Sequence, residues 1–440
     1  MVTRILKLSE LTPDQLLKLQ RRSELDIDQA IAVAQEVIER VRVQGDEGVI
    51  HYARTFDYEG ATTANLRVTA AEFAEAEAQI EPALRRAVEH AFQNIQTVHQ
   101  GQMPAPMHLG EIEAGVFAGE KITPLPSVGL YVPRGKGAFP SMMLMLAVPA
   151  RVAGVKRIVV CTPPDRQGKV EPVSLLAAQM AGVTEVYKLG GVQALAALAL
   201  GTATVPKVAK LIGPCSSYGA AAKRLLFGTV DVGLPAGPSE SIILADESTN
   251  PQWAALDLLI EAEHGPDSAA LLVTHVPSIA QTARKYLEKY LAQLPPWRQE
   301  FCRQGLDTYG GILLTPNLES SLDFINDYAP EHLQLLVADP LALVGKIHNA
   351  GEILLGAYTP SSAATYAIGV NAVLPTGGFA RSYSAVSVFD FLKRSTLAYL
   401  TAEGFAAVKE TVKILADYED FPAHALAIRE REAQGLEPTP

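Results

Sequence analysis

Short runs of β-branched and aliphatic residues alternate with longer Ala- and Leu-rich stretches from about residue 127 to residue 356. Apolar runs of about four to eight residues are typical of strands that are buried on both faces. Strands that alternate with helices pair in parallel, because each helix returns the chain to the same edge of the sheet. The pattern predicts strands at 127–133, 157–164, 185–191, 208–214, 241–246, 270–275, 311–316, 334–339 and 352–356.

These strands fall into two groups, and long amphipathic stretches precede and follow them. We therefore predict an α/β fold with two Rossmann-like parallel-sheet units, a helical N-terminal segment and a helical C-terminal arm. We expect the helical segment to pack with the second α/β unit and the C-terminal arm to cross a dimer. The predicted parts are an N-terminal helical arm (1–28), the helical segment (29–112), the first α/β unit (113–238), the second α/β unit (239–386) and the C-terminal arm (387–440).

Charge and cysteine usage limit the possible partners. The 440 residues include 37 basic and 48 acidic side chains, a net charge of −11, which disfavours nucleic acid and anionic membranes as main partners. Cys161, Cys215 and Cys302 lie far apart, so neither a disulfide framework nor a thiolate zinc site is indicated. Without a secretory segment or about 18 uninterrupted apolar residues, the sequence predicts a soluble cytoplasmic protein.

Four glycine-rich loops follow predicted strands. Parallel sheets commonly bind ligands outside the carboxyl ends of their strands, and helices that begin after such loops bind phosphate. The dinucleotide fingerprint G-x-G-x-x-G is absent, so this pattern alone leaves the cofactor open. The loops lie at 129–141, 190–202, 213–223 and 236–246.

A carboxylate and an imidazole lie three residues apart in a helix whose ends are marked by the sequence. Asn250 is a good N-cap and Gly265 ends the helix, so Glu261 and His264 share one face of its last turn. Two such side chains can share a divalent metal ion. The alternative is a solvated pair in which His264 simply caps the last turn.

Two further Glu and His pairs are candidates for proton transfer. Glu331 and His332 lie between a proline and a predicted strand, where a loop would hold both groups and His332 could act as a general base. A histidine packed over the sheet edge is an equal alternative. Glu419 and His424 begin a late helix, where an ordinary surface position is the simpler interpretation.

Seven segments, in this order, resemble those of the histidinol dehydrogenase family over nearly the whole chain. They are GLYVPRG, GGVQALAALALGT, LPAGPSE, EAEHGPDS, YAPEHL, VLPTGG and EDFPAHALAIR. The resemblance implies an NAD-dependent, zinc-assisted oxidation of L-histidinol to L-histidine through the aldehyde, a step of histidine biosynthesis. It also implies a homodimer whose active sites are shared between subunits.

The resemblance also implies roles for individual residues. His332 would take the alcohol proton and Glu331 would activate the water that attacks the aldehyde stage. Implied contacts with NAD come from Tyr131, Gln193 and Ser216. Implied substrate contacts come from Ser239, Glu261, His264, His332, Thr365, Glu419 and His424. The implied zinc ligands are Glu261, His264 and His424 of the partner subunit.

Several positions depart from the family pattern. Glu261 stands where the family has a zinc-binding glutamine, and Thr365 stands where it has a zinc-binding aspartate. A carboxylate at position 261 could replace the one missing at position 365, so zinc could still be held. Ala372 replaces a histidine and Ser216 replaces an asparagine. The sequence therefore leaves open histidinol oxidation, oxidation of another small alcohol, and a catalytically silent binding or assembly protein.

Overall fold

The computed structural model describes residues 3–22, 27–134 and 137–434, and the chain divides into two compact units. The first unit contains Met1–Gln102 and Leu125–Phe391, and the second contains Met103–Pro124 and Leu392–Pro440. Two parallel sheets lie in the first unit, and an antiparallel sheet lies in the second. The α/β class predicted from the alternating apolar runs is confirmed.

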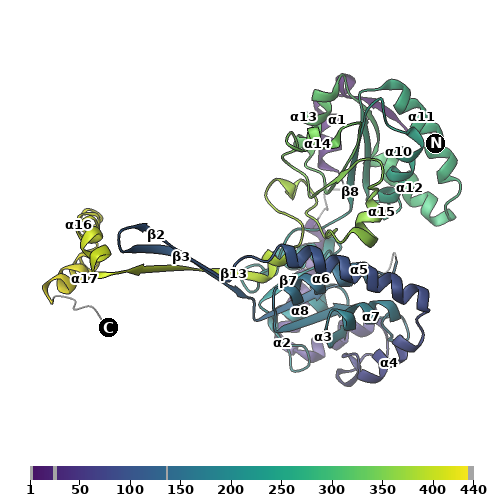
Figure 1. Ribbon diagram of the computed structural model, residues 1–440. Helices are drawn as coiled ribbons and strands as arrows, with labels where there is room; N and C mark the ends of the chain where they lie inside the picture. Colours follow the sequence, from purple (N-terminus) through teal and green to yellow (C-terminus); the bar gives the residue numbers. More distant parts are fainter. Residues whose placement is uncertain (1–2, 23–26, 135–136, 435–440) are drawn as a thin grey trace. The chain divides into compact units, whose positions relative to one another are not determined.

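The larger sheet of the first unit has six parallel strands in the order β1-β10-β9-β8-β11-β12. Its strands are β1 (Ile5–Lys7), β8 (Glu240–Ala245), β9 (Ala269–Thr274), β10 (Gly311–Leu314), β11 (His332–Leu336) and β12 (Glu352–Leu355). Every side chain of β8 is buried, because helices pack on both faces of the sheet (Figure 1). Helices α10 (Pro251–Ala262), α11 (Pro277–Leu291) and α12 (Pro296–Thr308) cover one face, and α1 (Pro13–Arg21), α13 (Leu318–Tyr328) and α14 (Pro340–Val344) cover the other.

The smaller parallel sheet has four strands in the order β6-β5-β4-β7. Its strands are β4 (Ser127–Tyr131), β5 (Arg157–Thr162), β6 (Glu185–Lys188) and β7 (Lys210–Ile212). The connecting helices are α6 (Pro140–Val152), α7 (Pro172–Met180), α8 (Gly191–Leu200) and α9 (Ser217–Leu226). Because β5 and β7 lie on opposite sides of β4, the strand order reverses beside β4, which is where parallel sheets open a crevice for ligands.

The N-terminal helical segment packs mainly against the four-stranded sheet unit rather than the predicted second α/β unit, although α5 (Pro82–Gly101) also contacts η4 (Ala364–Ile368) of the latter. Its helices are α2 (Ile27–Gln44), α3 (Asp46–Tyr52), α4 (Ala70–Ala78) and α5 (Pro82–Gly101). The buried face of α2, with Ala34 and Val37, shares one apolar core with Leu195 of α8 and Leu226 of α9. Periodicity identifies which face of a helix is buried, but it carries no information about which sheet that face meets.

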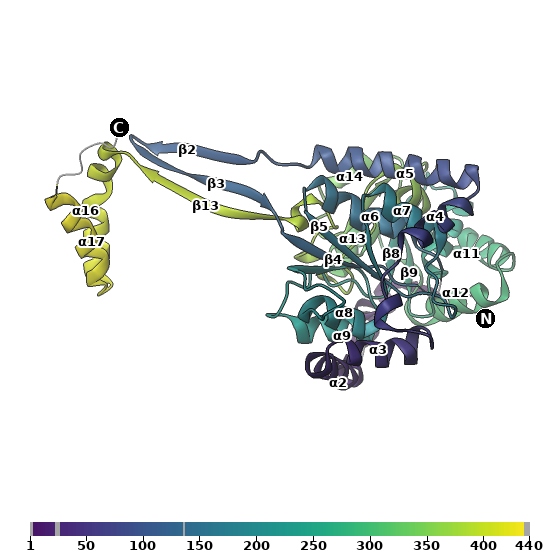
Figure 2. The ribbon, with the colours of Figure 1, turned by 90° about the horizontal axis from the view of Figure 1, so that it is seen from below.

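The second unit contains a long antiparallel sheet that the sequence analysis did not predict. Strands β2 (Met107–Glu113), β3 (Val116–Pro124) and β13 (Leu392–Leu400) pair with β3 in the centre, as Figure 2 shows. Helices α16 (Ala402–Tyr418) and α17 (Pro422–Ala433) follow β13 and pack together. The predicted boundary at 113 therefore cuts β2, and the predicted helical arm 387–440 begins with the short segment η6 (Val388–Phe391) and strand β13 before its two helices. Local patterns missed this pairing because β3 and β13 are distant in sequence.

Short helical segments complete the structure. They are η1 (Leu8–Glu10), η2 (Ala53–Asp57), η3 (Thr63–Asn65), α15 (Ser361–Ala363), η4 (Ala364–Ile368), η5 (Phe379–Arg381) and η6 (Val388–Phe391). Within the described ranges, none of the helices combines the length and the apolar character that crossing a bilayer requires.

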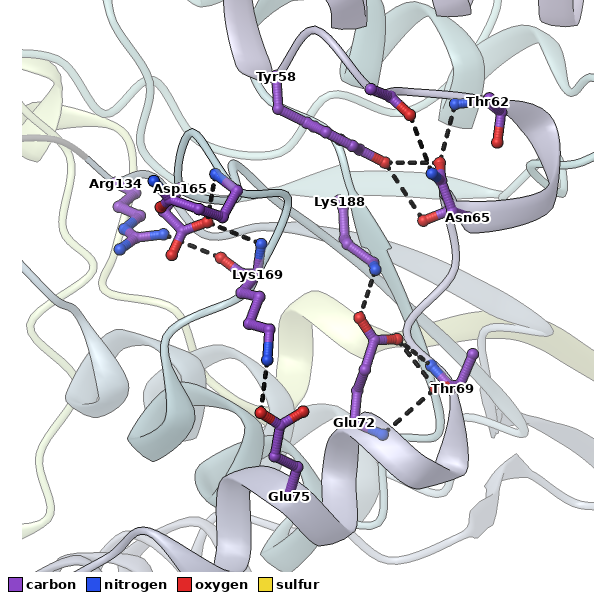
Figure 3. A network of polar contacts seen from close by, with 12 residues as sticks. Tyr58, Thr62, Asn65, Thr69, Glu72, Glu75, Arg134, Asp165, Lys169 and Lys188 are labelled. Carbon is purple, nitrogen blue, oxygen red and sulfur yellow. Dashed lines mark hydrogen bonds and ion pairs between the residues drawn. The ribbon is translucent and has the colours of Figure 1, made fainter.

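Two Lys and Glu pairs hold α4 against the four-stranded unit (Figure 3). Lys188 Nζ, at the end of β6, lies 2.5 Å from Glu72 Oε1, and only 6% of the Lys188 side chain is exposed. Thr69 caps α4, and its backbone N–H donates to Glu72 Oε2 over 2.8 Å. The second pair joins Lys169 Nζ to Glu75 Oε1, also at 2.5 Å, but both of its side chains are about half exposed. The pairs therefore differ chiefly in burial.

We expect Lys188→Met to lower the free energy of unfolding by about 1–3 kcal/mol, because Glu72 loses a buried charged partner. Lys169→Met is the matched control. It should change the free energy of unfolding little, since water already solvates the Lys169–Glu75 pair. Burial raises the pKa of Glu72, but Lys188 and Thr69 outweigh this effect and hold it below 4.5. The difference in free energy of unfolding between wild type and Lys188→Met should thus persist above pH 4.5. It should shrink in more acidic solution, where Glu72 is protonated. Denaturant unfolding at several pH values measures it, and equal losses in both variants would contradict the assignment.

Candidate active site

Four of the predicted site residues meet at the amino edge of the six-stranded sheet. His332 is the first residue of β11, and Glu331 comes directly before it. Glu261 lies in the last turn of α10, and His264 follows the end of that helix. In a βαβ connection the end of each helix returns to the amino edge of the sheet, so helix-end and strand-start residues meet there. These residues therefore lie at the edge opposite the carboxyl ends of the strands, where a crevice was predicted, and His332 belongs to a strand rather than a loop.

Three side chains converge on one buried point, which we call the Glu–His cluster: Glu261, Glu331 and His332. Their candidate ligand atoms all lie within 4.8 Å of one another. His332 Nε2 is 3.8 Å from Glu261 Oε2 and 3.7 Å from Glu331 Oε1. All three residues are buried, so their charges interact in a medium that screens them weakly.

His264 and Ser239 hold the Glu261 carboxylate from its other side. His264 Nδ1 lies 2.7 Å from Glu261 Oε1 and 3.2 Å from Ser239 Oγ. Ser239 directly precedes β8, so it belongs to the same edge of the sheet. The interaction between Glu261 and His264 that was expected from their three-residue spacing is present, and about half of the His264 side chain is exposed.

Glu331 is held by Glu240, whose own carboxylate forms a buried ion pair with Arg22. The backbone N–H of Glu240 donates to Glu331 Oε2 over 2.8 Å. The Glu240 carboxylate lies 2.7 Å from Arg22 Nη1 and accepts a hydrogen bond from the Gly377 backbone N–H, also over 2.7 Å. Arg22 further contacts the Tyr328 ring, 3.7 Å from its centre. The sequence analysis missed Arg22 and Glu240, because no local pattern connects the N-terminal arm with the start of β8.

The buried charges shift one another's protonation. Burial lowers the pKa of His332, but Glu331, Glu352 and Glu261 outweigh it and raise that pKa to about 10. Burial raises the pKa of Glu331 well above its ordinary value, against the attraction of His332. For Glu261, burial raises the pKa, but the stronger effect of His264 and His332 lowers it. The Glu–His cluster therefore holds protons at neutral pH when no other cation balances its carboxylates.

The cluster has the donor set and the vacant ligand atom that a divalent cation requires. Glu261 is 1% exposed, and its Oε2 atom has no hydrogen-bond partner within the described part of the chain. The carboxyl-terminal end of α10 carries partial negative charge and also favours a cation. Two carboxylates and an imidazole are ordinary ligands of zinc. Thr365 lies in η4, directly after α15, and α15 contacts α10.

A second candidate site lies at the carboxyl edge of the four-stranded sheet, where cofactor contacts were predicted. The backbone N–H of Gly191 donates to the hydroxyl of Tyr131, the last residue of β4, over 3.0 Å. Asp57 accepts hydrogen bonds of 3.1 Å from the Gly190 backbone N–H and from Gln193 Nε2. Gly191 has a φ of +58°, so a side chain there would be strained. The structure thus brings Tyr131 and Gln193 together at the start of α8.

Asp57 is a member of this second site that the sequence analysis did not find. It ends η2 in the N-terminal segment and is buried. Burial raises its pKa to about 6, against the hydrogen bonds from Gly190 and Gln193. Ser216 is exposed at the N-cap of α9, which also begins at this edge of the sheet. The positive ends of α8 and α9 make the edge suitable for an anionic group such as a pyrophosphate.

The other two predicted site residues lie in the second unit. Glu419 follows the end of α16 and His424 lies in α17, and both side chains are exposed. The His424 ring lies against Phe421, with 5.2 Å between the ring centres.

Comparison with known proteins identifies relatives of the whole chain. The family described as "Histidinol dehydrogenase" matches residues 20–432. A histidinol dehydrogenase of Synechocystis sp. is 79% identical over 431 residues, which cover 98% of this chain and 99% of that protein. A "histidinol dehydrogenase homolog" of Cereibacter sphaeroides is 48% identical over 96% of both chains.

A solved structure extends the likeness to three dimensions. The crystal structure of histidinol dehydrogenase from Elizabethkingia anophelis superposes with a TM-score of 0.93 at 33% identity, and the match covers 98% of both chains. Sequence and fold therefore agree along the chain, and the protein belongs to the histidinol dehydrogenase family.

Proposed function

We propose that the protein oxidises L-histidinol to L-histidine through the aldehyde, with NAD as oxidant and zinc as cofactor. The observation that supports this most directly is the buried Glu–His cluster, which joins a candidate base to a candidate water-activating carboxylate. The 79% identity with a protein named histidinol dehydrogenase supports the same substrate. A catalytically silent scaffold would have no need to bury these charges, because burying them is unfavourable.

His332 and Glu331 perform the proton transfers in this proposal. His332 Nε2 faces Glu261 and Glu331 and accepts the alcohol proton. Glu331 draws a proton from the water that attacks the aldehyde carbon. Ser239, bonded to His264, orients the substrate. NAD, when bound, supplies the acceptor for the hydride. Tyr131 and Gln193 contact it, and Ser216 lines the same edge of the sheet.

Of the Glu–His cluster, Glu261 would hold the zinc ion together with His264, and His424 of the partner subunit would complete the set, which leaves Glu331 and His332 for proton transfer. Zinc, when bound, supplies a Lewis acid that polarises the alcohol oxygen. Protons and the metal ion would compete for the Glu261 carboxylate. Positive charge placed beside Glu261 would therefore favour the neutral imidazole of His332 that a general base requires.

A homodimer with shared active sites accounts for the surface of the second unit. Most side chains of β2 and β13 are exposed, and a sheet of this kind is not stable when both faces lack cover. Large apolar side chains are exposed on α16 and after it, namely Ile414, Leu415, Tyr418 and Phe421. A second copy of the chain would cover them and bring Glu419 and His424 of the partner subunit to the site.

Purified protein with histidinol, NAD and zinc should form NADH. His332→Ala and Glu331→Gln should each lower kcat by about 100-fold or more, because each removes a proton-transfer group. Glu263→Gln, which changes the neighbouring half-buried acid at the end of α10, is a control that should retain activity. Absorbance at the NADH band measures the rate. Unchanged turnover in both site variants would contradict the assigned roles, and no turnover by wild type would exclude histidinol as substrate.

The carboxylate of Glu261 should determine whether zinc is retained. After dialysis against a weak chelator, wild type should keep about one zinc per chain, and Glu261→Gln should bind it about 10- to 100-fold more weakly. The double variant Glu261→Gln with Thr365→Asp should recover binding, because it restores one carboxylate to the site. Elemental analysis and competition with a chromogenic chelator measure both quantities. Full zinc retention by Glu261→Gln alone would refute the compensation between positions 261 and 365.

Asp57 should control the affinity for NAD through Gln193. In Asp57→Asn the new amide can donate a hydrogen bond, which turns the Gln193 amide and reverses its polarity toward the cofactor. We expect KM for NAD to rise by about tenfold, with kcat within about twofold of wild type. Asp46→Asn is the matched control, since Asp46 accepts bonds from Thr204 and also ties the N-terminal segment to this unit. A lower KM in Asp57→Asn would show instead that the Asp57 charge repels NAD.

A further inference from the structure

Glu352 lies directly beside the histidine of the Glu–His cluster. It is the first residue of β12, and in the parallel pairing of β11 with β12 it stands opposite His332. Its Oε1 atom lies 2.5 Å from His332 Nδ1, and the two side chains are only 9% and 8% exposed. The pair is therefore a buried, charge-assisted hydrogen bond that the strand register imposes.

This contact gives the two nitrogens of the ring different partners. Nδ1 donates its proton to Glu352, while Nε2 faces Glu261 and Glu331 at 3.8 and 3.7 Å. A hydrogen bond at one nitrogen of an imidazole fixes the orientation of the ring and the chemical state of the other nitrogen. We propose that Glu352 is a positioning residue of the active site. It keeps the Nδ1 proton of His332 in place and keeps Nε2 turned toward Glu261 and Glu331.

The surroundings of Glu352 favour this role over a purely structural one. Within the described residues, the side-chain hydrogen bond or ion pair of the Glu352 carboxylate is the one with His332, and its Oε2 atom has no hydrogen-bond partner. A carboxylate that served only stability would cost less free energy on the surface, because burial removes its hydration. Glu352 therefore lies, with 9% of its side chain exposed, where the strand register brings its carboxylate to the His332 ring.

The same strand provides an internal comparison. Gln334 lies two residues after His332, on the same face of β11, and its Nε2 donates to Asp257 Oδ2 over 2.8 Å. Asp257 lies in α10, one turn before Glu261, and burial raises its pKa. It thus holds a neighbouring position of β11 through a similar buried bond, but it contacts Gln334 rather than the Glu–His cluster.

The kinetic test uses Glu352→Ala, Glu352→Gln and Asp257→Asn. This inference rests on the proposed function, so histidinol oxidation is the assay. Glu352→Ala should lower kcat by about 10- to 100-fold, as loss of a supporting shell residue commonly does, with KM for NAD within about twofold. Glu352→Gln keeps an oxygen that accepts from Nδ1 and should recover most of the loss. Asp257→Asn should stay within about twofold of wild type in kcat. An unaffected Glu352→Ala, or an equal loss in Asp257→Asn, would overturn the proposal.

Proton NMR of the whole protein tests the contact without any turnover. The Nδ1 proton of His332 should give a strongly downfield resonance that exchanges slowly with water, because the hydrogen bond to the Glu352 carboxylate is charge-assisted and largely shielded from solvent. The resonance should persist in Asp257→Asn and vanish in both Glu352→Ala and His332→Ala. If it follows this pattern but wild type leaves histidinol unchanged, the proposed function fails while the positioning contact stands. If wild type turns over histidinol but the resonance does not depend on Glu352, the positioning role is refuted.

Discussion

The buried carboxylates that surround one imidazole are the constraint on which the rest of the site depends. Glu261, Glu331 and Glu352 all contact His332 within 4 Å, away from solvent. A buried charge that lacks a partner costs several kcal/mol, so such a group is stable only where positive charge is supplied. His264 supplies it at Glu261, and Arg22 supplies it at Glu240, which in turn holds Glu331. Arg22 of the N-terminal arm thereby stabilises the charges around the Glu–His cluster.

The candidate sites lie at opposite edges of the two parallel sheets. Helix dipoles explain why one edge suits a cation and the other an anion. At the amino edge of the six-stranded sheet, the end of α10 contributes negative partial charge beside Glu261, which suits a metal ion. At the carboxyl edge of the four-stranded sheet, the starts of α8 and α9 contribute positive partial charge, which suits the phosphates of a dinucleotide. Opposite ends of the helices thus give one sheet edge a charge that suits a cation and the other sheet an edge that suits an anion.

The sequence predicts those features that depend on local patterns. The nine predicted strands of the two parallel sheets all exist, because continuous apolar runs between helices allow few other structures. The spacing of Glu261 and His264 also predicts their contact, since three residues bring two side chains to one face. Both are properties of short segments, which sequence periodicity describes well.

Features that depend on pairing across long distances in sequence escaped prediction. Glu352 becomes a neighbour of His332 only through the register of β11 with β12, and Asp57 reaches Gln193 from a different part of the chain. The antiparallel pairing of β3 with β13 joins segments near opposite ends of the chain. No residue type marks such partners, because an isolated acid or an exposed strand has the same composition as many surface segments.

The place of β12 in the sheet has a consequence for dynamics. It is the last strand in the order and pairs with β11 alone, so only one set of backbone hydrogen bonds holds it. Edge strands held in this way are among the segments that open first in local fluctuations of the native state. Each opening of β12 would withdraw Glu352 and release the ring of His332, while β8 and β11 stayed paired. The fraction of time for which the imidazole is correctly held is then set by the opening equilibrium of β12, which hydrogen exchange at the Glu352 and Gly356 amides, the donors to β11, would report.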